Sequence, residues 1–184
     1  MQLVKLTRTQ VKRVYLRFLR KDFPDNERKS LGMILRSLDA GTYRCFGGFE
    51  EGKLVAYAFL VKHGERYLLD YLAAIPAKRG QGVGSALLRL LKEQLAGAQS
   101  VVAEVEDPAQ AETAAEKELR ERRLRFYLRN GFADPDVRFV TFGVPYQVIE
   151  LVLDAPHSPE EVRELYRAHY RAMLPEAVCK RFIR

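Results

Sequence analysis

The chain has 184 residues, of which 47% are hydrophobic and 30% are charged, and its formal net charge is +7. This length suits one domain, and the interleaving of apolar and charged residues excludes a disordered chain. No apolar run approaches the roughly 18–20 residues of a membrane helix, and the first residues lack a signal region, so we expect a cytoplasmic protein without a membrane partner. The positive charge favours an anionic partner but does not distinguish nucleic acid from a polyphosphate cofactor.

The two cysteines, Cys45 and Cys179, have neither the CxxC spacing nor the neighbouring histidine cluster of a metal site. We therefore expect two buried thiols and no metal. A single histidine is usually structural or exposed, so His63, His157 and His169 receive no catalytic role.

Two helices are predicted before the first strand pair. Apolar residues recur at helical spacing after Thr7 or Thr9, two candidate N-caps, and the pattern ends near Pro24. A second helix is predicted over residues 31–38. Residues 43–61 are rich in β-branched and aromatic side chains around a central turn, which predicts two antiparallel strands.

A third strand, over residues 67–75, ends at Pro76 and leads into a glycine-rich loop. An amphipathic helix is predicted from Ser85 onward. Residues 101–106 then predict a short strand, and residues 109–125 a largely solvated helix or loop.

Strands return at residues 137–142 and 146–153, after a helix stop at Gly131. A final helix begins at Ser158, whose hydroxyl suits a capping box. The chain ends in a basic segment, residues 179–184, which we expect to be a surface tail or a partner contact. This order of elements predicts a mixed α/β domain around one sheet.

The junction between the third strand and the next helix carries a loop that suits a pyrophosphate group. Glycines let the backbone approach a ligand closely, and the first amides of the helix have no intrahelical acceptors and lie at the positive end of the helix dipole. Lys78 and the first loop residue add positive charge. The loop is Arg79-Gly80-Gln81-Gly82-Val83-Gly84-Ser85.

Three phosphate-binding patterns compete for this loop. A dinucleotide-binding GxGxxG loop needs glycine or alanine at Ser85 and an acidic residue about 20 positions later, and neither Glu104 nor Glu106 has the right context. The Gly-Lys-Ser/Thr of a Walker A loop is absent. The third pattern, Arg/Gln-x-x-Gly-x-Gly/Ala, is satisfied by Arg79, Gly82 and Gly84.

In this pattern the chain resembles the GNAT N-acetyltransferases. The family has a strand and a proline before the loop, as from Leu72 to Pro76, and a later helix that ends in aromatic-Tyr-x-x-x-Gly-Phe, as in Phe126-Tyr127-Leu128-Arg129-Asn130-Gly131-Phe132. The resemblance implies a GNAT-type acyl-CoA N-acyltransferase fold, a mixed α/β fold with a central, mostly antiparallel, splayed sheet flanked by helices. It also implies one N-acetyltransferase domain over residues 1–184, including a C-terminal helix at 158–174 and the basic tail.

The resemblance further implies acetyl-CoA (coenzyme A) as the cofactor. In the family, the strand backbone at Leu72, Ala73 and Ala74 pairs with the pantetheine arm, and the amides of residues 80–85 bind the pyrophosphate. The tyrosine that matches Tyr127 often lies beside the thioester sulfur, where a phenol with a reference pKa of about 10 protonates the departing thiolate. The alternative role of Tyr127 is that of a packed aromatic at a helix end.

The chain departs from the family after the strand at 101–106. Many members carry an asparagine there that contacts the cofactor, whereas this chain has Asp107-Pro108 followed by a charged insertion. Most arginines of the insertion are expected on a solvated helix face, and one or two are candidates for the 3′-phosphate of the cofactor. These arginines are Arg120, Arg122, Arg123 and Arg125.

Acyl transfer needs a neutral amine, so a carboxylate or a water chain must take its proton. The candidates are Asp70, on an otherwise apolar and aromatic strand, and Glu104 and Glu106, which the two-residue period of a strand places on one face. Each is alternatively a surface charge or a structural salt bridge. No cysteine and no Ser-His-Asp arrangement has a spacing that suggests a covalent intermediate, which favours direct attack in a ternary complex.

The sequence thus predicts an enzyme, an acyl-CoA-dependent N-acyltransferase. Its partner is expected to be a small-molecule or peptide amine, held between the first two helices and residues 137–146. The alternative is a non-catalytic acyl-CoA-binding sensor, which would keep the loop but need neither Tyr127 nor a base. No nucleic-acid partner is expected, because the sequence lacks a recognition helix or an aromatic-interleaved basic strand. Monomer and homodimer both remain open.

Overall fold

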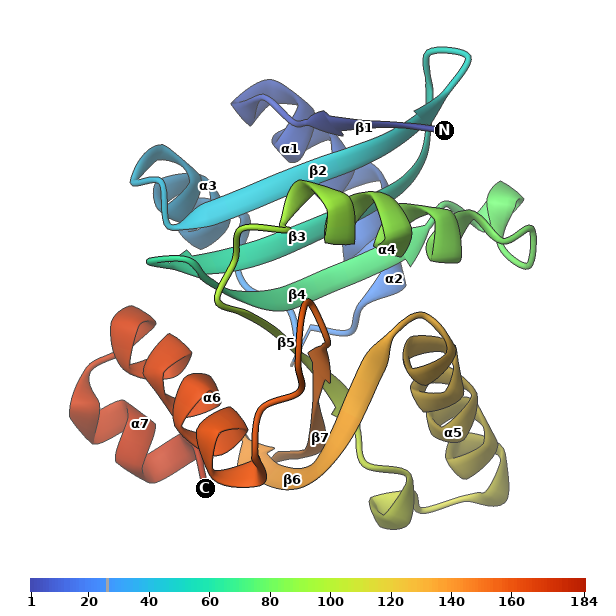
Figure 1. The fold of residues 1–184 in the computed structure, drawn as a ribbon. Coiled ribbons are helices and arrows are strands. Elements are labelled where there is room, and N and C mark those ends of the chain that lie inside the picture. The colour runs from blue at the N-terminus through green and yellow to red at the C-terminus, as the bar shows by residue number, and fades with distance from the viewer. Residues whose placement is uncertain (26) are drawn as a thin grey trace. The chain divides into compact units, whose positions relative to one another are not determined.

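The computed structural model in Figure 1 describes residues 1–25 and 27–184. The strands follow the order β1-β2-β3-β4-β5-β7-β6. β1 pairs antiparallel with β2, β2 with β3, and both β5 and β6 with β7. The prediction of a mixed α/β fold with a mostly antiparallel sheet flanked by helices is therefore confirmed.

The chain divides into two compact units. The first comprises residues 1–62 and 69–95, and the second comprises residues 63–68 and 96–184. β4 (Arg66–Ala74) contributes residues to both units. That residues 1–184 form a single acetyltransferase domain stays a prediction.

The first unit contains the predicted strand pair, β2 (Tyr43–Glu50) and β3 (Lys53–His63), and most of β4. The centre of β3 is buried on both faces, which its unbroken apolar run explains. β1 (Gln2–Lys5), which pairs with β2, was not predicted, because four residues are too few to establish an alternating pattern.

α1 and α3 begin where the sequence predicts, and α4 begins two residues before the predicted Ser85. Thr7 caps α1 in a capping box with Gln10, and Ser30 caps α3 through a hydrogen bond from the Met33 amide. α1 continues through a π-helical segment, Tyr15–Leu19, into α2. The helices are α1 (Arg8–Val14), α2 (Arg20–Asp22), α3 (Leu31–Asp39) and α4 (Val83–Gln94).

The second unit is built on β5, β7 and β6, with α5 and α6 on opposite sides of these strands in Figure 1. The predicted solvated segment is a helix, α5, whose residues are mostly exposed, and the predicted left-handed stop is confirmed at Gly131, with φ of 89°. The elements are β5 (Ser100–Glu106), α5 (Ala114–Arg129), β6 (Phe132–Thr141), β7 (Val144–Leu151), α6 (Pro159–Met173) and α7 (Glu176–Phe182).

The C-terminal segment packs against β6, so the expectation of a free surface tail is wrong, whereas the alternative of a partner contact stays a prediction. Most of it forms α7, and Ile183 then makes a β-bridge with Thr141. The Phe142 amide donates to the Phe182 carbonyl at 2.9 Å, and the Arg184 amide donates to the Val140 carbonyl at 3.0 Å. β6 is the last strand in the order, so its outer backbone groups are open to pairing. They bind the end of the chain even though that segment is rich in basic residues.

Candidate functional site

The glycine loop has the backbone geometry that an anion site needs. Gly80 and Gly82 both have φ of 75°, in the left-handed region, and Gly82 is the N-cap of α4. An N-cap glycine has no side chain with which to accept hydrogen bonds from the first helical amides, so these donors stay available to a ligand. A Cβ added at Gly80 or Gly82 would meet no heavy atom within 4 Å, so the space beside the loop is open.

Both positive side chains of the loop region are paired with carboxylates. Arg79 donates from Nη2 to Asp22 Oδ1 at 2.5 Å and from Nε to the Ala74 carbonyl at 3.3 Å. The Lys78 ammonium lies 3.0 Å from Glu50 Oε2. The sequence predicted the two cations but gave no indication of the carboxylates that face them.

The strand that leads into the loop changes from buried to partly exposed. Leu68 and Tyr71 are buried, whereas Leu72, Ala73 and Ala74 are half-buried. The Ala74 carbonyl accepts from Arg79, and the structure thus ties the strand end to the first loop residue. The pairing of this backbone with a pantetheine arm stays a prediction.

Asp70 forms a buried ion pair with Lys29. Its carboxylate accepts from the Lys29 ammonium at 2.6 Å and from the Tyr43 hydroxyl, and the Asp70 side chain is only 5% exposed. Burial raises the pKa of Tyr43, and the nearby Asp70 charge raises it further. This arrangement matches the structural salt bridge that was the alternative for Asp70.

Glu104 and Glu106 do not act as a pair. Glu104 Oε1 accepts from the hydroxyls of Tyr166 and Tyr170 on α6, each at 2.5 Å. Glu106 instead binds two arginines of α5: Arg123, and Arg120 at 3.3 Å.

The two carboxylates therefore have different partners, and their placement on one face of β5 stays a prediction. Glu106 is the last residue of β5, where its long side chain can reach the arginines of α5. Arg120 is buried and also donates to the Asp107 carbonyl at 2.9 Å, and Arg120 Nη2 lies 2.5 Å from Glu116. Arg120 and Arg123 thus have carboxylate partners within α5 and β5.

Tyr127 lies in an aromatic cluster at the end of α5. Its ring packs edge to face against Phe126 and Phe132, with centroids 5.2 and 5.0 Å away. Burial raises the pKa of Tyr127 to about 12, although the Arg123 charge opposes this. In the described part of the chain its hydroxyl makes no hydrogen bond. The geometry suits both packing and a protonated phenol, and the catalytic role stays a prediction.

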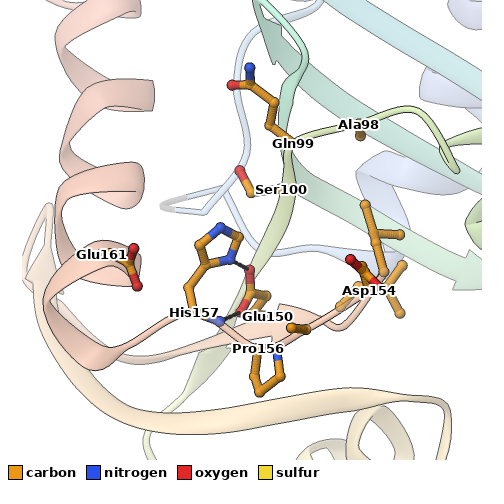
Figure 2. Close-up of a pocket in the computed structure, with 11 residues that line it drawn as sticks. Ala98, Gln99, Ser100, Glu150, Asp154, Pro156, His157 and Glu161 are labelled. Atoms are coloured by element: carbon orange, nitrogen blue, oxygen red, sulfur yellow. Dashed lines mark hydrogen bonds and ion pairs between the residues drawn. The ribbon is translucent and has the colours of Figure 1, made fainter.

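A cavity of about 350 Å³ lies in the second unit, between the start of β5 and the segment that precedes α6 (Figure 2). The buried Glu150 accepts from the His157 amide at 3.0 Å and contacts the His157 ring. Ser100 Oγ has no hydrogen-bond partner among the described residues. None of the predicted site residues lines this cavity, so it is distinct from the predicted cofactor loop.

Within residues 1–25 and 27–184, no group of three or more His, Cys, Asp or Glu side chains is arranged to hold a metal ion. Cys45 and Cys179 are both free and buried, as predicted. Over the same residues, no helix combines the length and hydrophobicity needed to cross a membrane.

Residues 41–134 match the sequence model of the acetyltransferase (GNAT) domain. This range contains the glycine loop and Tyr127 and ends before α6. Over 145 residues the chain is 38% identical to a mycothiol acetyltransferase of Nocardia farcinica, which covers 76% of this chain and 45% of that protein. The chain thus spans about half the length of this curated relative.

Solved structures give the same fold. A GNAT-family protein from Bacteroides thetaiotaomicron matches with a TM-score of 0.70 and 22% identity, over 92% of this chain and 96% of that chain. An aminoglycoside 6′-N-acetyltransferase complexed with coenzyme A matches with a TM-score of 0.58 and 14% identity, over 86% and 100% of the two chains. At these identities the likeness establishes the fold alone.

Proposed function

This chain belongs to the GNAT acetyltransferase family, and we propose that it transfers an acetyl group from acetyl-CoA to a primary amine of a small molecule or peptide. The amine attacks the thioester directly while both substrates are bound. We also propose that residues 1–184 act as one N-acetyltransferase domain.

The observation that carries this proposal is the backbone of the glycine loop. The left-handed Gly80 and Gly82 turn the chain so that α4 begins without a side-chain cap, next to open space. Free amides at the positive end of a helix favour a pyrophosphate over a neutral ligand. The coenzyme A complex of a protein with the same fold supports coenzyme A as the source of that pyrophosphate.

Bound acetyl-CoA supplies the thioester, whose acetyl carbon gains a C–N bond as its C–S bond breaks. In our proposal Glu104 takes one proton from the ammonium form of the acceptor, which frees the nitrogen lone pair. Tyr127 gives its phenolic proton to the departing thiolate, and the second proton that the nitrogen loses as the amide forms returns through water to the Tyr127 phenolate. The pKa of Tyr127, raised to about 12 by burial, keeps the phenol protonated and so able to donate at neutral pH.

We favour Glu104 over Asp70 and Glu106 as the base because the three carboxylates have different partners. Asp70 and Glu106 are each held by cationic side chains, and a base that must accept a proton there would have to break an ion pair. The partners of Glu104 on α6 are neutral phenols. A covalent acetyl-cysteine is not favoured, because burial raises the pKa of the Cys45 thiol and so disfavours the reactive thiolate.

The experiment that tests the function is a screen for release of the CoA thiol from acetyl-CoA across a panel of amines. The panel contains aminoglycosides, polyamines and peptides with a free N-terminus, and acetyl-CoA binding is measured in parallel by calorimetry. We expect thiol release that requires both the protein and one class of amine. Binding without release for every amine would support the acyl-CoA sensor instead, and the absence of binding would contradict both functions.

A further inference from the structure

The carboxylate of Glu104 accepts hydrogen bonds from two phenols of α6. Tyr166 and Tyr170 each donate a hydroxyl hydrogen bond of 2.5 Å, and both bonds end on the same oxygen, Oε1. Tyr166 is fully buried and Tyr170 is 5% exposed, whereas Glu104 is partly exposed. Glu104 therefore lies where the buried face of α6 meets the strand.

The position of the two phenols is fixed by the fold of α6. They lie four positions apart, about one helical turn, and their rings pack at a centroid distance of 5.1 Å. The helix starts at the capping box of Ser158, and its apolar side buries Val162 together with both tyrosines. The oxygens of Thr141 and Tyr166 lie 2.5 Å apart, which fixes the hydroxyl of Tyr166 from β6 as well.

This arrangement extends beyond the part of the chain that matches the family model. The match covers residues 41–134, which includes Glu104, whereas both tyrosines belong to α6, from Pro159 to Met173. A C-terminal addition to the matched region thus supplies two donors to a carboxylate within it.

We propose that Tyr166 and Tyr170 are positioning residues that hold Glu104 ionised and in one orientation for proton abstraction from the acceptor amine. This inference rests on the proposed function, in which Glu104 is the base. α6 is then a part of the catalytic apparatus rather than only a cover for the strands of the second unit.

The physical basis is that hydrogen bonds donated to a charged carboxylate favour its charged form. Burial raises the pKa of Tyr166 well above its usual value, and the adjacent Glu104 charge raises it further, so this phenol remains a donor. In the pair of β5 with β7, Val148 lies opposite Glu104, and β6 contributes Thr141, whose hydroxyl bonds to that of Tyr166. Glu106, on the same strand, is held by Arg120 and Arg123 of α5.

The test measures the titration of Glu104 in the ligand-free protein and the pH dependence of catalysis in the same variants. Carboxyl carbon NMR follows Glu104, with the resonance assigned by its loss in Glu104→Gln. We expect Tyr166→Phe and Tyr170→Phe each to move the midpoint of the Glu104 titration to higher pH, by about one unit per phenol. The acid limb of kcat/KM should move by the same amount, while the affinity for acetyl-CoA changes less than about twofold.

Ser158→Ala provides the matched control, because it removes the cap of α6 but leaves both phenols in place. It should lower the melting temperature without moving the Glu104 midpoint. If Tyr166→Phe does not fold, Tyr170→Phe carries the test, since its hydroxyl reaches the same oxygen of Glu104.

The outcomes separate this inference from the proposed function. A Glu104 midpoint that stays unchanged in folded Tyr166→Phe and Tyr170→Phe overturns the inference even if the enzyme is active. A midpoint that moves while the acid limb of kcat/KM does not would make the phenols partners of a structural carboxylate, which also overturns it. If the midpoint moves but the unmodified protein transfers no acetyl group to any amine, the proposed function fails and this inference fails with it.

Discussion

Arg79 and Asp22 form an ion pair that joins the glycine loop to the end of α2. The guanidinium lies 2.5 Å from Asp22 Oδ1, and the Asp22 side chain is only 6% exposed. The other carboxylate oxygen accepts from the buried Tyr57 hydroxyl at 2.7 Å. Arg79, the cation that the sequence predicts beside the phosphates, is therefore already paired with the Asp22 carboxylate.

This pair predicts that Asp22 weakens the binding of acetyl-CoA. Asp22→Asn keeps an acceptor for Tyr57 but removes a negative charge that repels the phosphates and neutralises Arg79. We expect the Kd for acetyl-CoA to fall about fivefold, equivalent to about 1 kcal/mol, and the effect to shrink at high salt. Calorimetric titration at low and high salt measures both effects.

Glu50→Gln is the matched control for Asp22→Asn. It releases Lys78 from a more exposed pair, which solvent screens more strongly, so its effect on the Kd should be smaller. Weaker acetyl-CoA binding by Asp22→Asn would instead show that the carboxylate orients Arg79 for the ligand.

The loop itself is tested by Gly82→Asp. The substitution places a negative side chain at the N-cap of α4, where it accepts from the free amides and repels an anion. We expect acetyl-CoA to raise the melting temperature of the unmodified protein through binding to the folded state, and Gly82→Asp to lose most of that shift. Differential scanning fluorimetry provides the measurement.

Gly41→Asp controls for the backbone strain of this change. Gly41 also has a positive φ, 77°, and open space beside it, but it follows α3 rather than preceding a helix. Its variant should lose a similar amount of stability, about 1 kcal/mol, and keep the acetyl-CoA shift. Equal ligand shifts in both variants would remove the glycine loop from the cofactor site.

Tyr127→Phe separates proton donation from packing. The change removes only the hydroxyl, which makes no hydrogen bond in the described part of the chain, so stability and acetyl-CoA affinity should hardly change. If Tyr127 is the acid, kcat should fall by about 10²-fold or more. The pKa of about 12 further predicts that Tyr127 causes no loss of activity below about pH 11, because its proton remains bound.

Tyr15→Phe is the matched change for Tyr127→Phe at a buried tyrosine whose hydroxyl donates to the Lys29 carbonyl at 3.0 Å. It should cost stability and leave kcat largely intact. Steady-state kinetics that give Tyr127→Phe the same kcat as Tyr15→Phe would assign Tyr127 to packing alone.

Local features of this fold were predictable because each depends on residues close together in the chain. The capping of α1 by Thr7 and of α6 by Ser158, and the left-handed Gly131, all follow from short-range geometry. The glycine loop belongs to the same class. β1 and α7 were missed, because the first is too short to show a period and the second lies in a segment dominated by basic residues.

The side-chain partners of the candidate site were not predictable in this way. Asp22 and Arg79 are 57 residues apart, and Glu104 and Tyr166 are 62 apart. Nothing in either local sequence selects the other, because these pairs form only after helices and strands pack. The two-residue period placed Glu104 and Glu106 together, yet α6 and α5 each provide partners for only one of them.

The buried His169 should make the free energy of unfolding depend on pH. Its ring is fully buried in α6, and neither nitrogen has a hydrogen-bond partner among the described residues. Burial, with smaller contributions from the nearby charges of His63 and Arg66, lowers the pKa of His169 to about 4. The unfolded chain, with a reference pKa of about 6.5, therefore binds a proton that the folded protein excludes.

Because the folded pKa of His169 lies below the unfolded one, its contribution to the free energy of unfolding is complete above about pH 6.5 and is lost as the pH falls toward 4, by up to about 3 kcal/mol. His169→Leu removes the titrating group, so the variant should lose less stability than the unmodified protein between pH 7 and pH 4.5. Urea unfolding at several pH values measures this difference. His63→Gln should remove only a small part of the pH dependence, since burial is the larger cause. Parallel pH profiles for His169→Leu and the unmodified protein would mean that the ring is hydrated or protonated in the folded state.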